Sequence, residues 1–193
     1  MKLKQIAAAL LLLTAYTTSA MAENYIIDIK DQHAFIQFKV KHLGYSWLLG
    51  EFRTFDGTFS YDEKNPERNK VSVTIKADSI DTNHAERNKH LRSPDFFDVK
   101  KYPSITFIST SYEDKGKGKG VIHGTLTMRG VSKDVAISVT QIGTGKDPWG
   151  GYRRGFEGHT TLYLSDYHMP FTPKLGPLAE NVELFLSIEG VRQ

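Results

Sequence analysis

The chain has 193 residues, with 25 basic and 22 acidic side chains and no cysteine. Its formal net charge of +3 is spread along the chain, whereas a nucleic-acid-binding protein needs a concentrated basic surface. The missing cysteine excludes a lipid-modified N-terminal cysteine, a thiolate nucleophile and a cysteine-ligated metal.

The first 22 residues have the pattern of a secretory signal peptide. Lys2 and Lys4 precede an apolar run over residues 6–15, and small residues at Ala20 and Ala22 fit the positions that a signal peptidase reads. The run is shorter than the roughly 20 apolar residues of a membrane-spanning helix. We therefore predict cleavage after Ala22 and a mature chain of residues 23–193, which forms one domain and carries a net charge of +1, since Lys2 and Lys4 are removed.

Alternation of apolar and polar residues dominates the mature sequence. It is clearest over residues 34–40, 71–77 and 182–188, where every second side chain is apolar. This period of two predicts β-strands with one buried face and one face in water. Weaker strands are expected over residues 25–29, 50–61, 104–111, 121–128, 135–142 and 155–164.

Turn signals separate these strands. Gly130 predicts a hairpin turn, residues 62–66 a turn-rich connection and the Gly-Lys run at 115–119 a hairpin loop. Three phenylalanines in the 50–61 strand break the period of two, which predicts a β-bulge near residues 55–57. One short helix is expected over residues 85–91, with Asn83 as its N-cap.

About eight antiparallel strands and one short helix favour an all-β fold in which the sheet closes into a barrel, because closure removes the exposed edges of an open sheet. An eight-stranded barrel has room for one ligand when its side chains do not fill it. A β-sandwich is the alternative, and periodicity alone does not separate the two.

Several segments together resemble one protein family. They are residues 33–42 (HAFIQFKVKH), 50–59 (GEFRTFDGTF), 81–98 (DTNHAERNKHLRSPDFFD), 102–103 (YP), 124–131 (GTLTMRGV) and 147–156 (DPWGGYRRGF). This pattern is similar to that of the YceI family of periplasmic, polyisoprenoid-binding, lipocalin-like proteins, and it extends over nearly the whole mature chain. One departure is Asn88, where the family usually carries Asp, and it puts in doubt any role of this position that needs a charge.

The resemblance implies an extended eight-stranded antiparallel barrel around an elongated apolar tunnel. It also implies a periplasmic location and a bound isoprenoid chain, such as that of a quinone or a polyprenyl phosphate, or another long amphiphile. No cofactor is implied.

A soluble lipid carrier needs a deep site with apolar walls. We expect this site to be lined by apolar residues from the predicted strand faces, although such residues also fill the core of any β protein. The candidates are Ile36, Phe38, Val40, Phe52, Phe59, Val73, Ile75, Phe107, Leu126, Phe156, Leu184, Leu186 and Ile188.

Six further residues are candidates for the mouth of the pocket or for contact with a polar headgroup. Amphipathic rings in loop-like segments suit a mouth, and guanidinium groups bind carbonyl and phosphate oxygens. The candidates are Tyr45, Trp47, Trp149, Arg87, Arg153 and Arg154. A packed loop or a surface ion pair is the alternative role for each of them.

The sequence offers little for catalysis or for a metal. It contains no Gly-x-Ser-x-Gly elbow, phosphate loop or dinucleotide fingerprint. His84 and His90 are six residues apart, which is not the spacing of a paired helical metal site. His33 and His42 are expected to make structural hydrogen bonds. We therefore predict a non-enzymatic carrier of a long-chain lipid with no metal, no nucleic-acid partner and no transmembrane segment. An interaction protein with a filled barrel is the alternative, and a homodimer is left open.

Overall fold

A computed structural model describes residues 22–193. The predicted signal peptide lies outside the described residues, except for Ala22. Within the described part, eleven strands form one antiparallel sheet. They are β1 (Glu23–Ile27), β2 (Phe35–His42), β3 (Ser46–Phe52), β4 (Phe55–Tyr61), β5 (Lys70–Lys76), β6 (Ile80–Asp81), β7 (Ser104–Gly116), β8 (Lys119–Met128), β9 (Val131–Lys146), β10 (Tyr152–Tyr163) and β11 (Asn181–Arg192).

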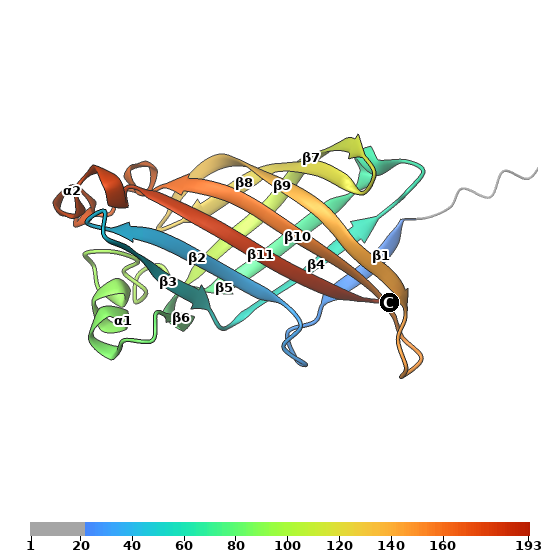
Figure 1. Ribbon diagram of the computed structural model, residues 1–193, viewed down its shortest axis with the longest axis horizontal. Helices are drawn as coiled ribbons and strands as arrows, with labels where there is room; N and C mark the ends of the chain where they lie inside the picture. The colour runs from blue at the N-terminus through green and yellow to red at the C-terminus, as the bar shows by residue number, and fades with distance from the viewer. Residues whose placement is uncertain (1–21) are drawn as a thin grey trace, which may run out of the picture.

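The sheet closes on itself as a barrel. Strands β1, β4, β5, β7, β8, β9, β10 and β11 are neighbours in this order, and β1 also pairs with β11, so that the ring has eight strands. The closed, antiparallel, lipocalin-like barrel expected from the sequence is therefore confirmed, and the sandwich alternative is excluded. Figure 1 shows that the barrel is elongated and that its strands run obliquely along it.

Three of the eight strand positions are each built from two segments. β11 pairs with β1 through residues 190–192 and with β2 through residues 182–187. The next position holds β4 beside β1 and β3 beside β2, and the third holds β5 beside β4 and β6 beside β3. Eleven segments thus fill eight positions, because the chain breaks its hydrogen-bonded ladder where it changes direction.

The expected bulge at residues 55–57 is wrong. The β4–β5 register is regular from Phe55 to Ser60, and the chain instead breaks at Arg53 and Thr54. The backbone of these two residues bonds to Ser79 and Lys76, which bridges β3 to β4. Two residues outside the ladder allow Phe52 and Phe55 to be buried together, which explains the irregular spacing.

Two hairpin turns follow the expected chemistry. Arg129 and Gly130 both have positive φ between the paired ends of β8 and β9, and Lys117 and Gly118 do so between β7 and β8. Two successive positive φ angles are typical of a type I′ turn, which matches the twist of the flanking strands.

Most of the short helices gather at one end of the barrel, and the one between β4 and β5 lies toward the other. The α-helices are α1 (Ala85–Arg92) and α2 (Thr172–Leu175), and the 3-10 helices are η1 (Pro66–Arg68), η2 (Ala77–Ser79), η3 (Leu164–Tyr167) and η4 (Pro177–Ala179). Figure 1 places α1, α2 and the β2–β3 turn at one end, which we call the helical end, and the C-terminus and the β9–β10 loop at the other, the terminal end. The prediction of one helix was incomplete, because a four-residue helix is too short to produce a periodic pattern.

Packed side chains close the helical end. Phe52, Ile80, Phe96, Tyr167 and Met169 are all buried there. Phe52 meets Phe97 edge to face with ring centroids 5.7 Å apart, an arrangement that aromatic rings favour. The interior is therefore solid beneath the helices, and free space lies only further along the barrel.

Helix α1 begins at Ala85, as predicted, but its N-cap is a different residue from the predicted one. The N-cap is His84, whose Nδ1 accepts a hydrogen bond from the Arg87 backbone N–H at 3.2 Å. Asn83, the predicted cap, instead takes a left-handed backbone conformation with φ of 57°. An asparagine suits that conformation, because its short polar side chain tolerates positive φ.

Asn88 is a buried connection between α1 and the barrel. Its Oδ1 accepts hydrogen bonds from the Thr82 backbone N–H at 2.8 Å and from the Thr82 hydroxyl at 2.6 Å. Its Nδ2 donates to Asp81 Oδ1 at 2.9 Å, and this bond contributes to holding the pKa of Asp81 below its ordinary value, after the bond from the Asn83 backbone. The amide both accepts and donates here, which an ionised carboxylate does not do.

We expect Asn88→Asp to destabilise the protein increasingly as the pH rises. The new carboxyl group faces Asp81, and two ionised carboxylates at this distance repel each other, so the pKa of one of them is raised. A group whose pKa is raised in the folded state loses its stabilising effect as the pH rises through that pKa. The melting temperature at pH 7 should fall by about 5–10 °C, with a smaller loss at pH 4, as measured by circular dichroism. Asn88→Ala is the control, and its loss should be nearly independent of pH.

Candidate functional site

The barrel encloses a long cavity. About 1150 Å³ between its lining side chains holds no protein atom, a figure that includes space open to solvent. Along β10 the lining runs from Phe156 to Leu162, a distance of about 20 Å at ~3.3 Å per residue. The free space is therefore long and narrow, as a hydrocarbon chain requires.

The wall of the cavity is almost entirely hydrocarbon. Besides two tyrosines, only Ser60, Asn69 and Thr160 bring polar side chains, and each is already engaged with the protein. The Ser60 hydroxyl accepts from the Lys70 backbone, Asn69 Oδ1 accepts from the Asp62 backbone, and the Thr160 hydroxyl donates to the Ala136 carbonyl. A ligand here meets apolar surface with few polar groups to satisfy.

Glycines on other strands let two lining rings lie against the wall. A Cβ atom at Gly120 would lie 2.2 Å from the Tyr112 hydroxyl oxygen, and one at Gly190 would lie 2.4 Å from the Phe59 ring. Each ring occupies the space that a side chain would take. The rings therefore fold down onto the backbone and leave the interior open.

The structure brings most of the predicted pocket residues together. Ten of the thirteen candidates line the cavity, namely Ile36, Phe59, Val73, Ile75, Phe107, Leu126, Phe156, Leu184, Leu186 and Ile188. Phe38, Val40 and Phe52 do not. They also face inward, but they lie toward the helical end, where Phe38 and Phe52 pack together with ring centroids 6.0 Å apart.

Other lining residues were not among the candidates. They are Ile27, Val71, Ile122, Val135, Ile137, Val139, Leu162, Tyr61, Tyr112 and Gly158, besides Ser60, Asn69 and Thr160. The alternating apolar positions 135, 137 and 139 carried a usable signal, since they share one strand face. Tyr61 and Tyr112 gave no such signal in the sequence, because their place in the wall depends on which strands become neighbours.

Beside the cavity, toward the terminal end, Arg154 is buried among inward-facing side chains. Its guanidinium stacks on the Tyr61 ring at 3.7 Å from the centroid, and donates to the Tyr25 hydroxyl at 3.2 Å and to Gln141 Oε1 at 2.8 Å. Burial alone would lower the pKa of Arg154, but the bond to Tyr25 and the charge of Glu23, 3.5 Å away, hold that pKa above its ordinary value. A permanent positive charge therefore lies beside Tyr61, a cavity-lining residue.

Arg153, the neighbour of Arg154, points to the outside of the barrel because successive strand residues face opposite sides. Trp149, in the β9–β10 loop, is exposed and lies 5.7 Å from the Arg153 guanidinium. Three of the six predicted mouth residues, Trp149, Arg153 and Arg154, thus belong to the terminal end.

The other three mouth candidates lie at the helical end. Tyr45 is in the exposed β2–β3 turn and Trp47 is on the outer face of β3. Arg87 donates to the Thr82 hydroxyl and carbonyl and holds the segment before α1. The six residues therefore do not form one mouth, because their segments leave the barrel at opposite ends.

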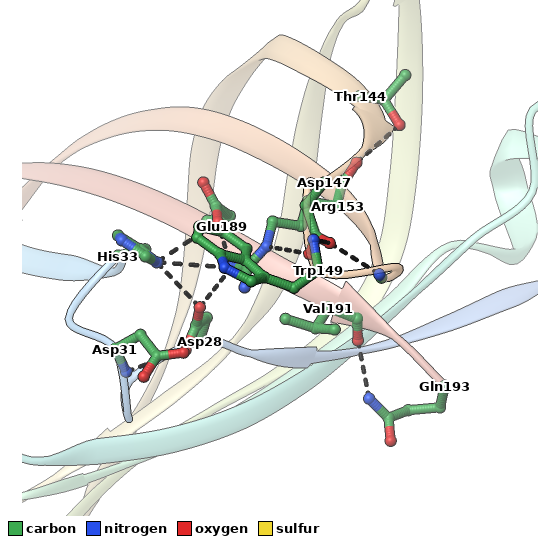
Figure 2. Close-up of polar contacts among 11 residues, drawn as sticks. Asp28, Asp31, His33, Thr144, Asp147, Trp149, Arg153, Glu189, Val191 and Gln193 are labelled. Carbon is green, nitrogen blue, oxygen red and sulfur yellow. Dashed lines mark hydrogen bonds and ion pairs between the residues drawn. The ribbon is translucent and has the colours of Figure 1, made fainter.

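Figure 2 shows a network of charges centred on Arg153. Its Nε contacts Asp147 at 2.7 Å, and its Nη1 contacts both Asp28 and Glu189. His33 Nδ1 lies 3.0 Å from Asp28. The network joins the β9–β10 loop, β11 and the connection between β1 and β2, where the ladder of the first strand position is interrupted.

The ligand atoms of Asp28, His33 and Glu189 lie within 4.8 Å of one another, as in a metal site. Arg153 Nη1 is bonded to both carboxylates and lies 3.5 Å from His33 Nδ1. A guanidinium therefore already supplies the positive charge that these groups attract. The geometry favours a structural ion network over metal binding.

The network makes stability depend on pH. Burial works to raise the pKa of Asp28, but hydrogen bonds from Arg153 and His33 hold it below its ordinary value. The bond from Arg153 lowers the pKa of Asp147 as well. A lowered folded-state pKa stabilises the fold above the ordinary carboxyl range, and this contribution is lost as the pH falls through the folded-state pKa.

We expect Arg153→Met to lower the melting temperature at pH 7 by on the order of 10 °C, because buried Asp28 loses its guanidinium partner and keeps only the bonds from His33 and the Asp31 backbone. The stability of the variant should also fall less steeply than that of the wild type between about pH 5 and pH 2, since the lowered carboxyl pKa values revert. Thermal unfolding across this range checks both effects. An unchanged acid slope would contradict the role given to Arg153, and Lys30→Met serves as an exposed control.

Among residues 22–193, no helix is long and apolar enough to cross a membrane.

Comparison with known proteins identifies relatives over nearly the whole chain. Residues 27–190 match the model of the YceI-like domain family. A UPF0312 protein of Ectopseudomonas mendocina is 57% identical over 192 residues, which cover 99% of this chain and 100% of the relative.

Solved structures share the barrel. The Campylobacter jejuni YCEI protein matches with a TM-score of 0.72 at 33% identity, over 80% of this chain and 91% of that protein. A polyisoprenoid binding domain from Saccharophagus degradans matches with a TM-score of 0.61 at 15% identity, over 88% of this chain and 98% of that domain. The second likeness is one of fold.

Proposed function

This chain belongs to the family of YceI-like domains, and from that premise and the form of its interior we propose that it binds a long-chain lipid of the isoprenoid type and does so without catalysing a reaction. The observation that carries the proposal is the long apolar cavity with its few, already bonded polar groups. The alternative of an interaction protein with a filled barrel is disfavoured, because the interior is not filled.

The energetics of such a ligand are favourable. Burial of roughly 500 Å² of prenyl chain contributes a gross free energy of about 12 kcal/mol at ~25 cal/mol per Å². The lost freedom of the chain and of the complex opposes a large part of this.

The similarity in fold adds support. The Saccharophagus degradans domain is named as polyisoprenoid binding, and its barrel is built as this one is. For the present chain we infer the same class of ligand, a hydrocarbon with repeated methyl branches. A wall of phenylalanine, valine, isoleucine and leucine side chains offers the apolar surface that such a chain needs.

We further infer that the tail lies among the ten predicted residues that line the cavity and that a polar headgroup lies at the terminal end. Arg154, beside Tyr61, offers a guanidinium for a carbonyl or phosphate oxygen. Trp149 and Arg153 lie outside this end. Tyr45, Trp47 and Arg87 belong to the opposite end and are not part of this headgroup site.

The composition of the lining supports the proposed non-enzymatic role. Its only titratable side chains are tyrosines, and burial raises the pKa of both Tyr61 and Tyr112. Neutral phenols in an apolar channel give neither a nucleophile nor a base at neutral pH. The predicted signal peptide supports a periplasmic location for this binding.

The direct test is to purify the mature protein from the periplasm without detergent and to analyse its denatured extract by mass spectrometry. We expect a stoichiometric long-chain lipid, which also identifies the ligand. An extract without lipid, together with no uptake of an added prenyl quinone or prenyl phosphate, would sink the proposal.

Variants that fill the cavity test its location. Val73→Phe and Val135→Phe add a ring to the lumen, so we expect each to lower the bound lipid at least about tenfold, since a few lost contacts of this size correspond to that change in affinity. Ile108→Phe makes the same kind of change on the exposed outer face of β7 and is the matched control. Equal lipid content in all three proteins would place the ligand elsewhere.

A further inference from the structure

A group of exposed apolar side chains forms one surface at the helical end, which we call the tip surface. Its members and their exposed fractions are Leu43 (62%), Tyr45 (87%), Trp47 (42%), Leu49 (66%) and Leu178 (51%). Trp47 and Leu49 share the outer face of β3, and Tyr45 lies in the turn directly before this strand. Leu178 of η4 lies against the β2–β3 turn, since a Cβ atom at Gly44 would be 3.2 Å from its Cδ1.

Leu43 is placed at the apex of the turn at a conformational cost. Its φ is 53°, in the left-handed region, where a bulky side chain without a local hydrogen bond is rare. Asparagine and glycine are the residues that such a turn favours. A leucine that is both strained and exposed contributes little to the fold, and strain of this kind is typical of functional positions.

Positive charge accompanies the tip surface. The ammonium groups of Lys39 and Lys41 lie 4.5 and 5.5 Å from the centroid of the Trp47 ring. The hairpin carries no acidic side chain between Lys39 and Gly50. Lys39 also pairs with Glu183 on β11 at 2.9 Å, so Lys41 supplies the positive charge that is not shared with a carboxylate of β11.

The size and form of the tip surface indicate its partner. At about 200 Å² for each fully exposed side chain, it offers roughly 600 Å² of apolar surface. A stable protein dimer needs about 800 Å² from each partner and 20–30 residues, whereas the tip is a convex hairpin turn with five. A lipid bilayer accepts a convex apolar tip, places tryptophan and tyrosine at its interface and attracts lysine when its lipids are anionic.

We propose that the tip surface docks the barrel, helical end first, onto a membrane that contains anionic lipids. Leu43, Tyr45 and Leu178 enter the acyl boundary, and Lys41 lies among the headgroups. The docking goes beyond the proposed carriage of lipid and does not depend on a cargo, because every residue of the tip surface lies outside the cavity.

The two tryptophans of the chain make the orientation measurable. Trp47 lies at the helical end and Trp149 at the terminal end, and there are no others. In Trp149→Phe, the remaining Trp47 should shift its emission to the blue with vesicles of phosphatidylethanolamine and phosphatidylglycerol. In Trp47→Phe, the remaining Trp149 should not shift. A shift of Trp149 alone, or of neither, would overturn the proposal.

Leu43→Asn separates a binding role from a structural one. Asparagine suits the left-handed conformation, so this variant should melt about 2–4 °C higher than the wild type. The double variant Leu43→Asn/Tyr45→Ser should bind the same vesicles at least about tenfold less, as measured by co-sedimentation. Ile142→Ser, which removes an equally exposed side chain from β9, is the matched control and should bind normally.

Further measurements distinguish the alternatives. Vesicles of phosphatidylcholine alone should bind more weakly, and Lys41→Gln should remove most of that difference. If the tip variants bind vesicles like the wild type, or if they change the molecular mass in solution instead, the surface is not a membrane-docking surface, and in the second case it joins two copies of the chain. Cargo measured in the same preparations by mass spectrometry shows whether lipid carriage holds independently.

Discussion

The pairing of β11 with β1 is the constraint on which the rest of the structure depends. The last strand meets the first through residues 190–192, and the same edge of β11 continues with β2. Closure leaves the ring without free edges and turns one face of every strand toward a single interior. An inward side chain therefore either packs against other side chains or borders open space.

Packed side chains and cavity-lining side chains occur in the same barrel, at different positions along it. Toward the helical end, the interior is filled by buried rings and aliphatic groups from β3, β6 and the segment that carries η3. Further along, Phe59 and Tyr112 lie on glycines of other strands, and the space between the walls stays free. At the terminal end, Arg154 replaces hydrocarbon with a charge. From the helical end to the terminal end, the interior of the barrel is thus first packed, then hollow, and then occupied by a charged side chain.

Much of the fold was predictable, because a strand with one face in water and one face in the interior has alternating polar and apolar residues. The long alternating segments correspond to β2, β5 and β11, and their inward residues include Ile36, Val73 and Leu186 of the cavity wall. The broken strand positions were not predictable. The interruption at Arg53 and Thr54 is set by bonds to residues more than twenty positions away, which local periodicity does not record.

The candidate site was predicted in part for the same reason. Alternation tells which residues face inward, but it does not tell where along the barrel the cavity ends, so Phe38, Val40 and Phe52 were expected in its wall and lie outside it. Tyr45 and Trp149 look alike in sequence, as exposed rings in loops. Only the direction of the strands that carry them assigns the two to opposite ends.

The residues that contact a ligand and the residues that determine the width of the channel are not the same in this barrel. Gly120 and Gly190 do not line the cavity, yet each determines how far a neighbouring ring reaches into it. A methyl group added at either glycine would push the ring that covers it further into the channel and so narrow it. Selectivity for thick or thin hydrocarbon chains can therefore diverge between such barrels while every residue in contact with the ligand stays the same.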